Sequence, residues 1–200
     1  MTTRKSTDSE EEKKRRKVEL AAKWYHPLSS GSVQLHEVLS TMEVWKLYQK
    51  DIPLIIKLTE NPNYITARFL GGAVNLFTHD CIHALLGRGS LVKDEAFVIG
   101  YTMGSSKKMR RWRRNLFMFV CKYFYPEGYR FGEEERFVFY SGVMAGNRCP
   151  TDLSKVDFES LADYKVQEIR EKLGINEELL KCYYCTEKKL FPNSRESQRL

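Results

Sequence analysis

The sequence predicts an all-α protein, a single helical domain that contains a metal-binding helical hairpin. Apolar residues recur at helical spacing along most of the chain, and glycine and proline stand where these segments begin or end. No convincing alternating strand pattern appears, since only residues 136–140 (RFVFY) alternate briefly, and no internal repeat is visible.

The N-terminal half begins with a charged stretch, residues 1–17, which we expect to be a disordered arm. A loop with Pro27 and Gly31 covers residues 24–32, and Val38, Met42 and Trp45 then share one face of a helix. The helices predicted in this half span residues 33–50, 53–58 and 64–86. The last of these contains no proline and ends at a glycine-rich turn over residues 87–89, after which Ser90 is a plausible N-cap.

The C-terminal half continues with amphipathic segments. Pro150 marks a turn, and Gly174 supplies a helix stop. The helices predicted here span residues 91–103, 107–125, 133–145, 158–173 and 177–189, followed by a polar tail. We therefore expect a helical domain over residues 18–175 and a C-terminal extension over residues 176–200.

Composition narrows the class of protein. Two hundred residues with 42% apolar side chains are typical of one globular domain. No run of 18 apolar residues could span a membrane, and the charged start lacks the apolar core of a secretory signal. Acidic residues within 8–12 also argue against a mitochondrial transit peptide, and five scattered cysteines fit a reducing compartment.

One group of side chains with metal-binding chemistry lies between residues 79 and 95. His79, Asp80 and His83 share a short segment, and Glu95 follows 12 residues after His83. In a helix the two histidines lie roughly 40° apart at an i, i+4 spacing, so both imidazoles can reach one ion. A tight helical hairpin would bring Glu95 face to face with His83. Spacing alone leaves a second interpretation open, two helix histidines beside a surface carboxylate.

Two imidazoles and two carboxylates suit one divalent ion, and these residues do not distinguish zinc, cobalt, iron and manganese. The site would be mononuclear, because the chain lacks the two Glu-x-x-His units of a di-iron bundle. Asp80 has three open roles: a direct ligand, an orienting group for a histidine, or a general base.

The pattern His79-Asp80-x-x-His83, eleven residues and then Glu95 resembles the metal motif of the coenzyme Q biosynthesis protein 4 family. Residues 79–87 (HDCIHALLG) are similar to the family's His-Asp-x-x-His-x-Leu-x-Gly pattern, and residues 166–175 (VQEIREKLGI) to its closing helix. The resemblance spans about residues 35–175. Two places differ, since residues 87–90 (GRGS) replace a common Pro-Thr loop and Asp94 replaces a common glycine.

The resemblance implies a divergent member of an α-helical, membrane-associated family that handles polyprenylated benzoate intermediates on the way to ubiquinone. The implied reaction is oxidative decarboxylation at ring carbon 1. His79, His83 and Glu95 would be metal ligands, Asp80 a ligand or base, and Asp80 and Glu95 the catalytic residues. The implied location is the cytoplasmic face of a bacterial membrane or the matrix side of the mitochondrial inner membrane. The implied assembly is a homodimer or a quinone-biosynthesis complex.

Two other functions remain open. One is a non-catalytic lipid-binding scaffold of a quinone-biosynthesis complex, in which the metal is structural. The other is a His-Asp phosphohydrolase, which also needs an upstream histidine and a downstream aspartate. The candidates for those two roles are His26, His36, Asp152, Asp157 and Asp163. We rank this function below the others because Glu95 has no place in its pattern.

A basic segment, Lys107–Arg114 (KKMRRWRR), runs directly into an aromatic apolar stretch. A helix with a basic end and Trp112 suits a membrane interface, where each arginine contributes about 1 kcal/mol at anionic headgroups. We expect membrane contact here, with Phe117, Phe119 and Tyr123 lining the path of a lipid tail. A core helix with a solvated basic end is the alternative. The net charge of +7 would also fit nucleic acid, but no nucleic-acid-binding motif accompanies it, so that partner ranks last.

Cys182 and Cys185 form one Cys-x-x-Cys, which is half of a zinc site. No second pair accompanies it, so we interpret the two as partly buried thiols on a C-terminal helix.

Overall fold

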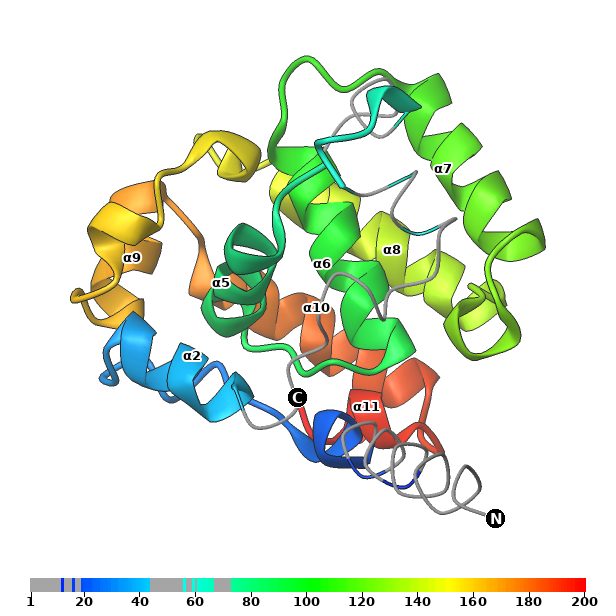
Figure 1. The fold of residues 1–200 in the computed structure, drawn as a ribbon. Coiled ribbons are helices and arrows are strands. Elements are labelled where there is room, and N and C mark those ends of the chain that lie inside the picture. The colour runs from blue at the N-terminus through cyan, green and yellow to red at the C-terminus, as the bar shows by residue number, and fades with distance from the viewer. Residues whose placement is uncertain are drawn as a thin grey trace, which may run out of the picture.

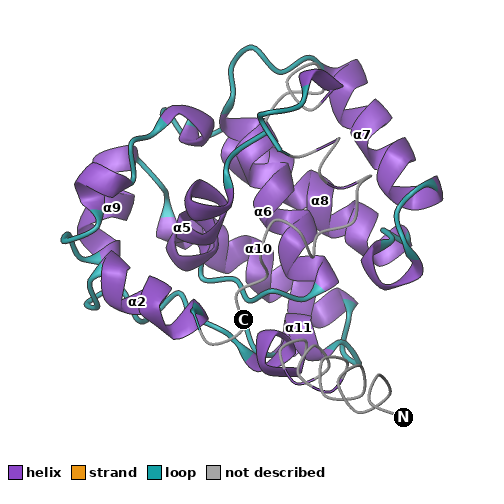
Figure 2. Ribbon diagram, in the orientation of Figure 1, coloured by secondary structure: helices purple, strands orange, loops and turns teal. Residues whose placement is uncertain are grey.

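The protein is built from helices (Figures 1 and 2). The computed structural model describes residues 12, 16, 19–43, 56, 59, 61–66 and 73–200. Over these residues it contains no β-strand, only an isolated antiparallel bridge between Gln34 and Lys165. The predicted all-α class is therefore confirmed for the described part of the chain.

The helices whose bounds the structure describes come in this order along the chain. They are α2 (Leu35–Met42), α5 (Leu76–Leu86), α6 (Val92–Ser105), α7 (Arg111–Tyr123), α8 (Glu133–Gly146), α9 (Val166–Leu173), α10 (Glu177–Leu190) and α11 (Arg195–Gln198), with 3-10 turns η2 (Glu127–Tyr129), η3 (Leu153–Lys155) and η4 (Glu159–Leu161). In Figure 1, α6 runs through the middle of the molecule, α5 and α9 lie to its left, and α7 forms the right edge. None of these described helices has the length and apolar character needed to cross a bilayer.

The closest helix packing in the described chain is between α6 and α8. Both helices carry glycines four residues apart, Gly100 and Gly104 on α6 and Gly142 and Gly146 on α8. A methyl group at Gly100 would overlap the backbone carbonyl oxygen of Phe139, and one at Gly142 would overlap that of Phe97. Glycine lowers helix propensity, so its use here reflects the need for close backbone approach. From Phe97 onward, α6 is thereby held firmly against α8.

Gly142→Ala is expected to lower the free energy of unfolding by about 1–3 kcal/mol, because the added methyl must push α6 and α8 apart. Urea denaturation measures the loss. Gly128→Ala is the matched control, since a methyl at that glycine would meet nothing within 4 Å. Equal urea midpoints for the two variants would contradict the close packing of these helices.

One hydrophobic core joins the described helices. Phe117 of α7 is fully buried and stacks on Phe139 of α8, with ring centroids 5.8 Å apart. Phe97 of α6 meets Tyr184 of α10 edge to face, with centroids 5.2 Å apart. Nearly all residues of α6 are buried in this core, which fixes the position of a group carried at its start.

Several of the predicted helix boundaries are wrong, and the helix predicted over 107–125 spans only Arg111–Tyr123. A single helix over 158–173 is interrupted, because the backbone of residues 164–166 pairs with residues 33–35: Leu35 N–H donates to Tyr164 and Val166 N–H donates to Val33. The helix predicted over 64–86 is not continuous, since residues 73–75 are not helical and the Asn75 side chain caps α5. Ser90 is not an N-cap; its hydroxyl donates to the carbonyl of Ala21, and Leu91 holds the N-cap position.

Other expectations are confirmed or lie outside the described residues. Gly87 and Gly174 end α5 and α9 with positive φ values of 65° and 72°, as predicted for C-terminal helix stops. The predicted polar tail instead includes α11 and buries Ser197. The charged arm over 1–17, except Glu12 and Arg16, and most of the helix predicted over 53–58 lie outside the described residues, as does the end of the helix predicted over 33–50.

Candidate metal centre

A helical hairpin made of α5 and α6 carries the candidate ligands. The Asn75 side chain accepts the N–H of Thr78 at 2.7 Å and starts α5 one turn before His79. Gly87 ends α5 in the left-handed region, and a methyl there would also meet the backbone of Leu28 at 2.7 Å. Beyond the turn, the carboxylate of Asp94 accepts the N–H of Leu91 at 3.1 Å and starts α6, which places Glu95 in its first turn.

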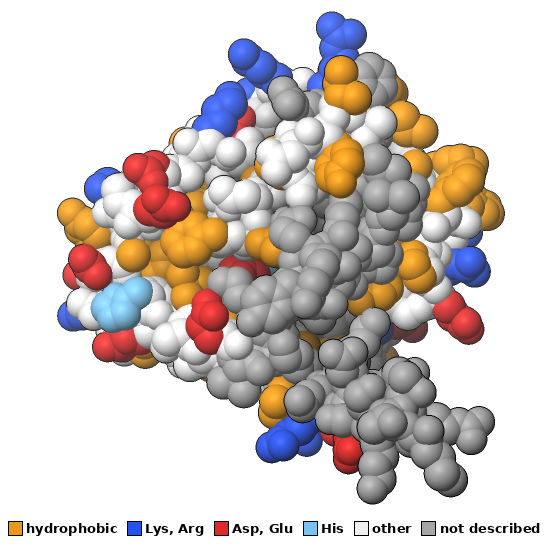
Figure 3. Space-filling model, viewed as in Figure 1, with side chains coloured by type: hydrophobic (Ala, Val, Ile, Leu, Met, Phe, Trp, Pro, Cys, Tyr) orange, Lys and Arg blue, Asp and Glu red, His pale blue; other side chains and the backbone are white. Residues whose placement is uncertain are grey.

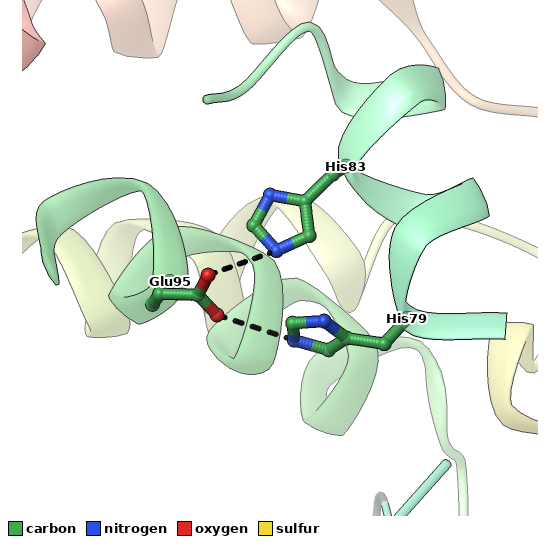
Figure 4. Close-up of side chains that lie close together, drawn as sticks. All are labelled: His79, His83 and Glu95. Atoms are coloured by element: carbon green, nitrogen blue, oxygen red, sulfur yellow. Dashed lines mark ion pairs between the residues drawn. The ribbon is translucent and has the colours of Figure 1, made fainter. Parts of the chain in front are cut away.

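The hairpin brings His79, His83 and Glu95 together (Figure 4). The Nε2 atom of His79 lies 3.3 Å from Oε2 of Glu95, and Nε2 of His83 lies 3.3 Å from Oε1. The two imidazole rings meet at a steep angle, with centroids 4.6 Å apart. One ligand atom from each residue fits within 4.8 Å of the others, so the three side chains form a group that could hold a metal ion.

The three side chains differ in exposure, which gives the group an inner and an outer side. The His83 side chain is 2% exposed, that of His79 18% and that of Glu95 31%. Burial opposes the charge on Glu95, but the nearby imidazoles of His83 and His79 outweigh it and hold the pKa of that carboxyl well below its usual range. Glu95 therefore presents a carboxylate to both rings and to the solvent side.

Asp80 is the predicted site residue that this group does not include. It follows His79 on α5 and is partly buried, but it is absent from the ligand group that the described residues form. Its roles as ligand, orienting group or base stay predictions. The group also includes none of the candidates for a phosphohydrolase, His26, His36, Asp152, Asp157 and Asp163. Of these, His36 pairs with Asp163 at 3.5 Å, and Asp152 caps η3.

A network of buried charged side chains surrounds the turn between His83 and Glu95, and the sequence does not predict it. Arg88 is fully buried and donates two hydrogen bonds to Glu187 of α10, at 3.1 Å and 2.6 Å. Its guanidinium group lies against the rings of both Phe97 and Tyr184, at 4.1 Å and 4.3 Å from their centroids.

Asp94 connects this network to the end of the described chain. Its buried carboxylate lies 3.8 Å from Arg88 and contacts Arg199, which follows α11. Burial raises the pKa of Asp94, and both arginines act against that rise. The turn and the residue directly before Glu95 are thus fastened to α10 and α11.

Tyr129 of η2 lies close enough to the centre to respond to its charge. Burial and the negative charge of Glu95 both raise the pKa of Tyr129. Its side chain remains 40% exposed. The sequence carried no signal for this residue, because nothing in its pattern relates η2 to α6.

Cys182 and Cys185 do not add a second centre among the described residues. Both thiols are exposed on α10, so the prediction that they are partly buried is wrong. The inner face of α10 is occupied by Leu180, Tyr184 and Glu187, which leaves the cysteines on the outer side. They belong to no metal-binding group in the part of the chain that the structure describes.

The fold and the site define a class, a helical protein with two histidines and one carboxylate grouped on a hairpin. Comparison with known proteins adds no relative, because no family model, no curated protein and no solved structure matches the chain.

Proposed function

We propose that this chain binds one divalent metal ion through His79, His83 and Glu95 and acts in ubiquinone biosynthesis on polyprenylated benzoate intermediates. The proposed reaction is oxidative decarboxylation at ring carbon 1, at the surface of a membrane. The observation that supports it most directly is the convergence of the three ligands at the motif spacing of the resembled family.

The donor set fits a metal. Two imidazole nitrogens and a carboxylate oxygen suit zinc, cobalt, iron and manganese, and in catalytic centres such three-ligand sets leave positions for water or substrate. The partial exposure of Glu95 supports such an opening on one side. A bound metal of this kind would polarise the substrate carboxylate and hydroxyl. The oxidative part would need dioxygen as the oxidant and a redox-active metal to activate it, which zinc could not do.

Residues around the centre would bind the metal, face the substrate and transfer protons. His83, being buried, would anchor the inner side of the centre, while Glu95 would face the opening. Asp80 would act as a fourth ligand or as a base, from its position next to His79. Tyr129, which is partly exposed and whose pKa the charge of Glu95 helps to raise, would donate a hydrogen bond to a bound ring.

Glu95→Gln is expected to abolish rescue of a ubiquinone-deficient strain, because it removes the charge of a ligand at nearly constant volume. Growth on a respiratory carbon source and the cellular ubiquinone content measure the effect. Glu159→Gln, at an exposed glutamate on η4, is the matched control and should rescue fully. Full rescue by a folded Glu95→Gln protein would favour the alternative function, a lipid-binding scaffold with a structural metal.

A further inference from the structure

Helix α7 presents a continuous apolar stripe to solvent. Trp112, Leu116, Phe119 and Tyr123 recur at the spacing i, i+4, i+7 and i+11, which places them within roughly 60° of one another around the helix. Their exposed fractions are 43%, 37%, 52% and 58%, and Phe124 directly after the helix is 60% exposed. So many large apolar side chains on one exposed face mark an interaction site.

The opposite face of α7 is fastened to the body of the protein. Phe117, Met118 and Cys121 are buried there, and Phe117 stacks on Phe139 of α8. Phe117 therefore does not share a face with Phe119 and Tyr123, and the three do not line one lipid path as the sequence suggested. The exposed stripe is therefore a second apolar face of α7, and the packing of the buried face keeps it directed toward solvent.

The basic segment before the stripe divides into inward and outward cations. Lys107 donates to the carbonyls of Asn147 and Cys149, and Arg114 donates to Met103 and to the Asn147 side chain. Lys108, Arg110 and Arg111 are exposed and form no ion pair with a described residue. Figure 3 shows basic side chains at the top, where the loop before α7 lies in Figure 1, and hydrophobic ones along the right edge.

The charge of this surface favours an anionic lipid bilayer as the partner. Residues 107–125 contain seven lysines and arginines and no aspartate or glutamate. A second copy would bring like charges together, which opposes a dimer through this face. Nucleic acid would engage the cations but leave the aliphatic and aromatic stripe without an apolar environment. A bilayer offers both, headgroups for the cations and an acyl boundary for the stripe.

We infer that α7 lies on the surface of an anionic bilayer. The stripe enters the acyl boundary, and Lys108, Arg110 and Arg111 contact lipid phosphates. This deepens the membrane part of the proposed function but does not depend on the metal centre, which is built from other helices.

Vesicle co-sedimentation of the full chain tests the inference. Vesicles of phosphatidylcholine with phosphatidylglycerol are compared with phosphatidylcholine alone. Leu116→Ser with Phe119→Ser should weaken partitioning to anionic vesicles by about tenfold or more, and so should charge reversal to glutamate at Lys108, Arg110 and Arg111. The controls are Leu190→Ser, at an apolar residue 51% exposed on α10, and charge reversal at Lys165, Lys172 and Lys189, all exposed.

The outcomes separate this inference from the proposed function. If the test variants lose vesicle binding while their thermal stability and metal content stay as in the wild type, α7 is supported as the docking surface. This result does not depend on whether the metal centre is catalytic. Anionic-vesicle binding that survives both test variants overturns it. Binding to duplex DNA but not to vesicles, or a dimer that the stripe variant dissociates, would overturn it in favour of nucleic acid or a second copy.

Discussion

His83→Gln is expected to lower metal affinity by about 100-fold or more, because His83 supplies the buried ligand of a three-residue group. The neutral amide keeps much of the volume of the imidazole, so the fold should survive. Chelator competition with zinc or cobalt measures the dissociation constant, and elemental analysis of the purified protein should give about one ion per wild-type chain.

The matched control for this experiment is His36→Gln. His36 is an exposed histidine that pairs with Asp163 and lies outside the ligand group. Its replacement should leave the metal content unchanged. A full equivalent of metal with wild-type affinity in His83→Gln would show that the three side chains are not a metal site.

Arg88→Met is expected to lower the free energy of unfolding by about 3–5 kcal/mol, because it leaves the buried carboxylate of Glu187 without its cation and removes one of the two arginines beside Asp94. Methionine retains much of the apolar contact with Phe97 and Tyr184. Urea denaturation by circular dichroism measures the change, which should be among the largest of any single substitution in this protein.

A second substitution separates the charge effect from packing. Adding Glu187→Met to Arg88→Met should recover a large part of the loss, since the double variant removes both members of the pair. Lys181→Met, which breaks the exposed pair with Glu178, should have little effect. A double variant that is less stable than Arg88→Met would contradict the assignment of the loss to an unpaired buried charge.

The ligand group could be predicted from the sequence because its members are close in the chain. His79 and His83 are one helical turn apart, and the left-handed Gly87 reverses the chain before Glu95. Local rules of helix spacing and helix termination are sufficient to bring such residues together. The structure confirms the convergence of these three and leaves Asp80 beside them on α5.

The ion network could not be predicted in the same way. Arg88 is 99 residues from Glu187, and Asp94 is 105 residues from Arg199. No local pattern relates such positions, and charged residues are usually read as solvent-exposed. Arg88 and Asp94 lie at the two places where the sequence differs from the pattern it resembles, and they fasten the turn to α10 and α11.

The interrupted helices were missed for a related reason. Residues 158–173 have helical composition, but the pairing of 164–166 with residues 33–35 takes the backbone groups that a continuous helix would use. Likewise, the sequence predicts that Phe117 lies together with Phe119 and Tyr123, and only the burial of Phe117 separates the core face of α7 from its exposed stripe.

The turn after α5 and its partners on α10 and after α11 are about 100 residues apart in the sequence, which affects the order in which they form during synthesis. At about 5–20 residues per second, a ribosome makes Arg199 about 5–20 s after Asp94. During that interval Arg88 and Asp94 have neither Glu187 nor Arg199 to neutralise them. The hairpin therefore reaches its final form only after α10 and α11 have been synthesised.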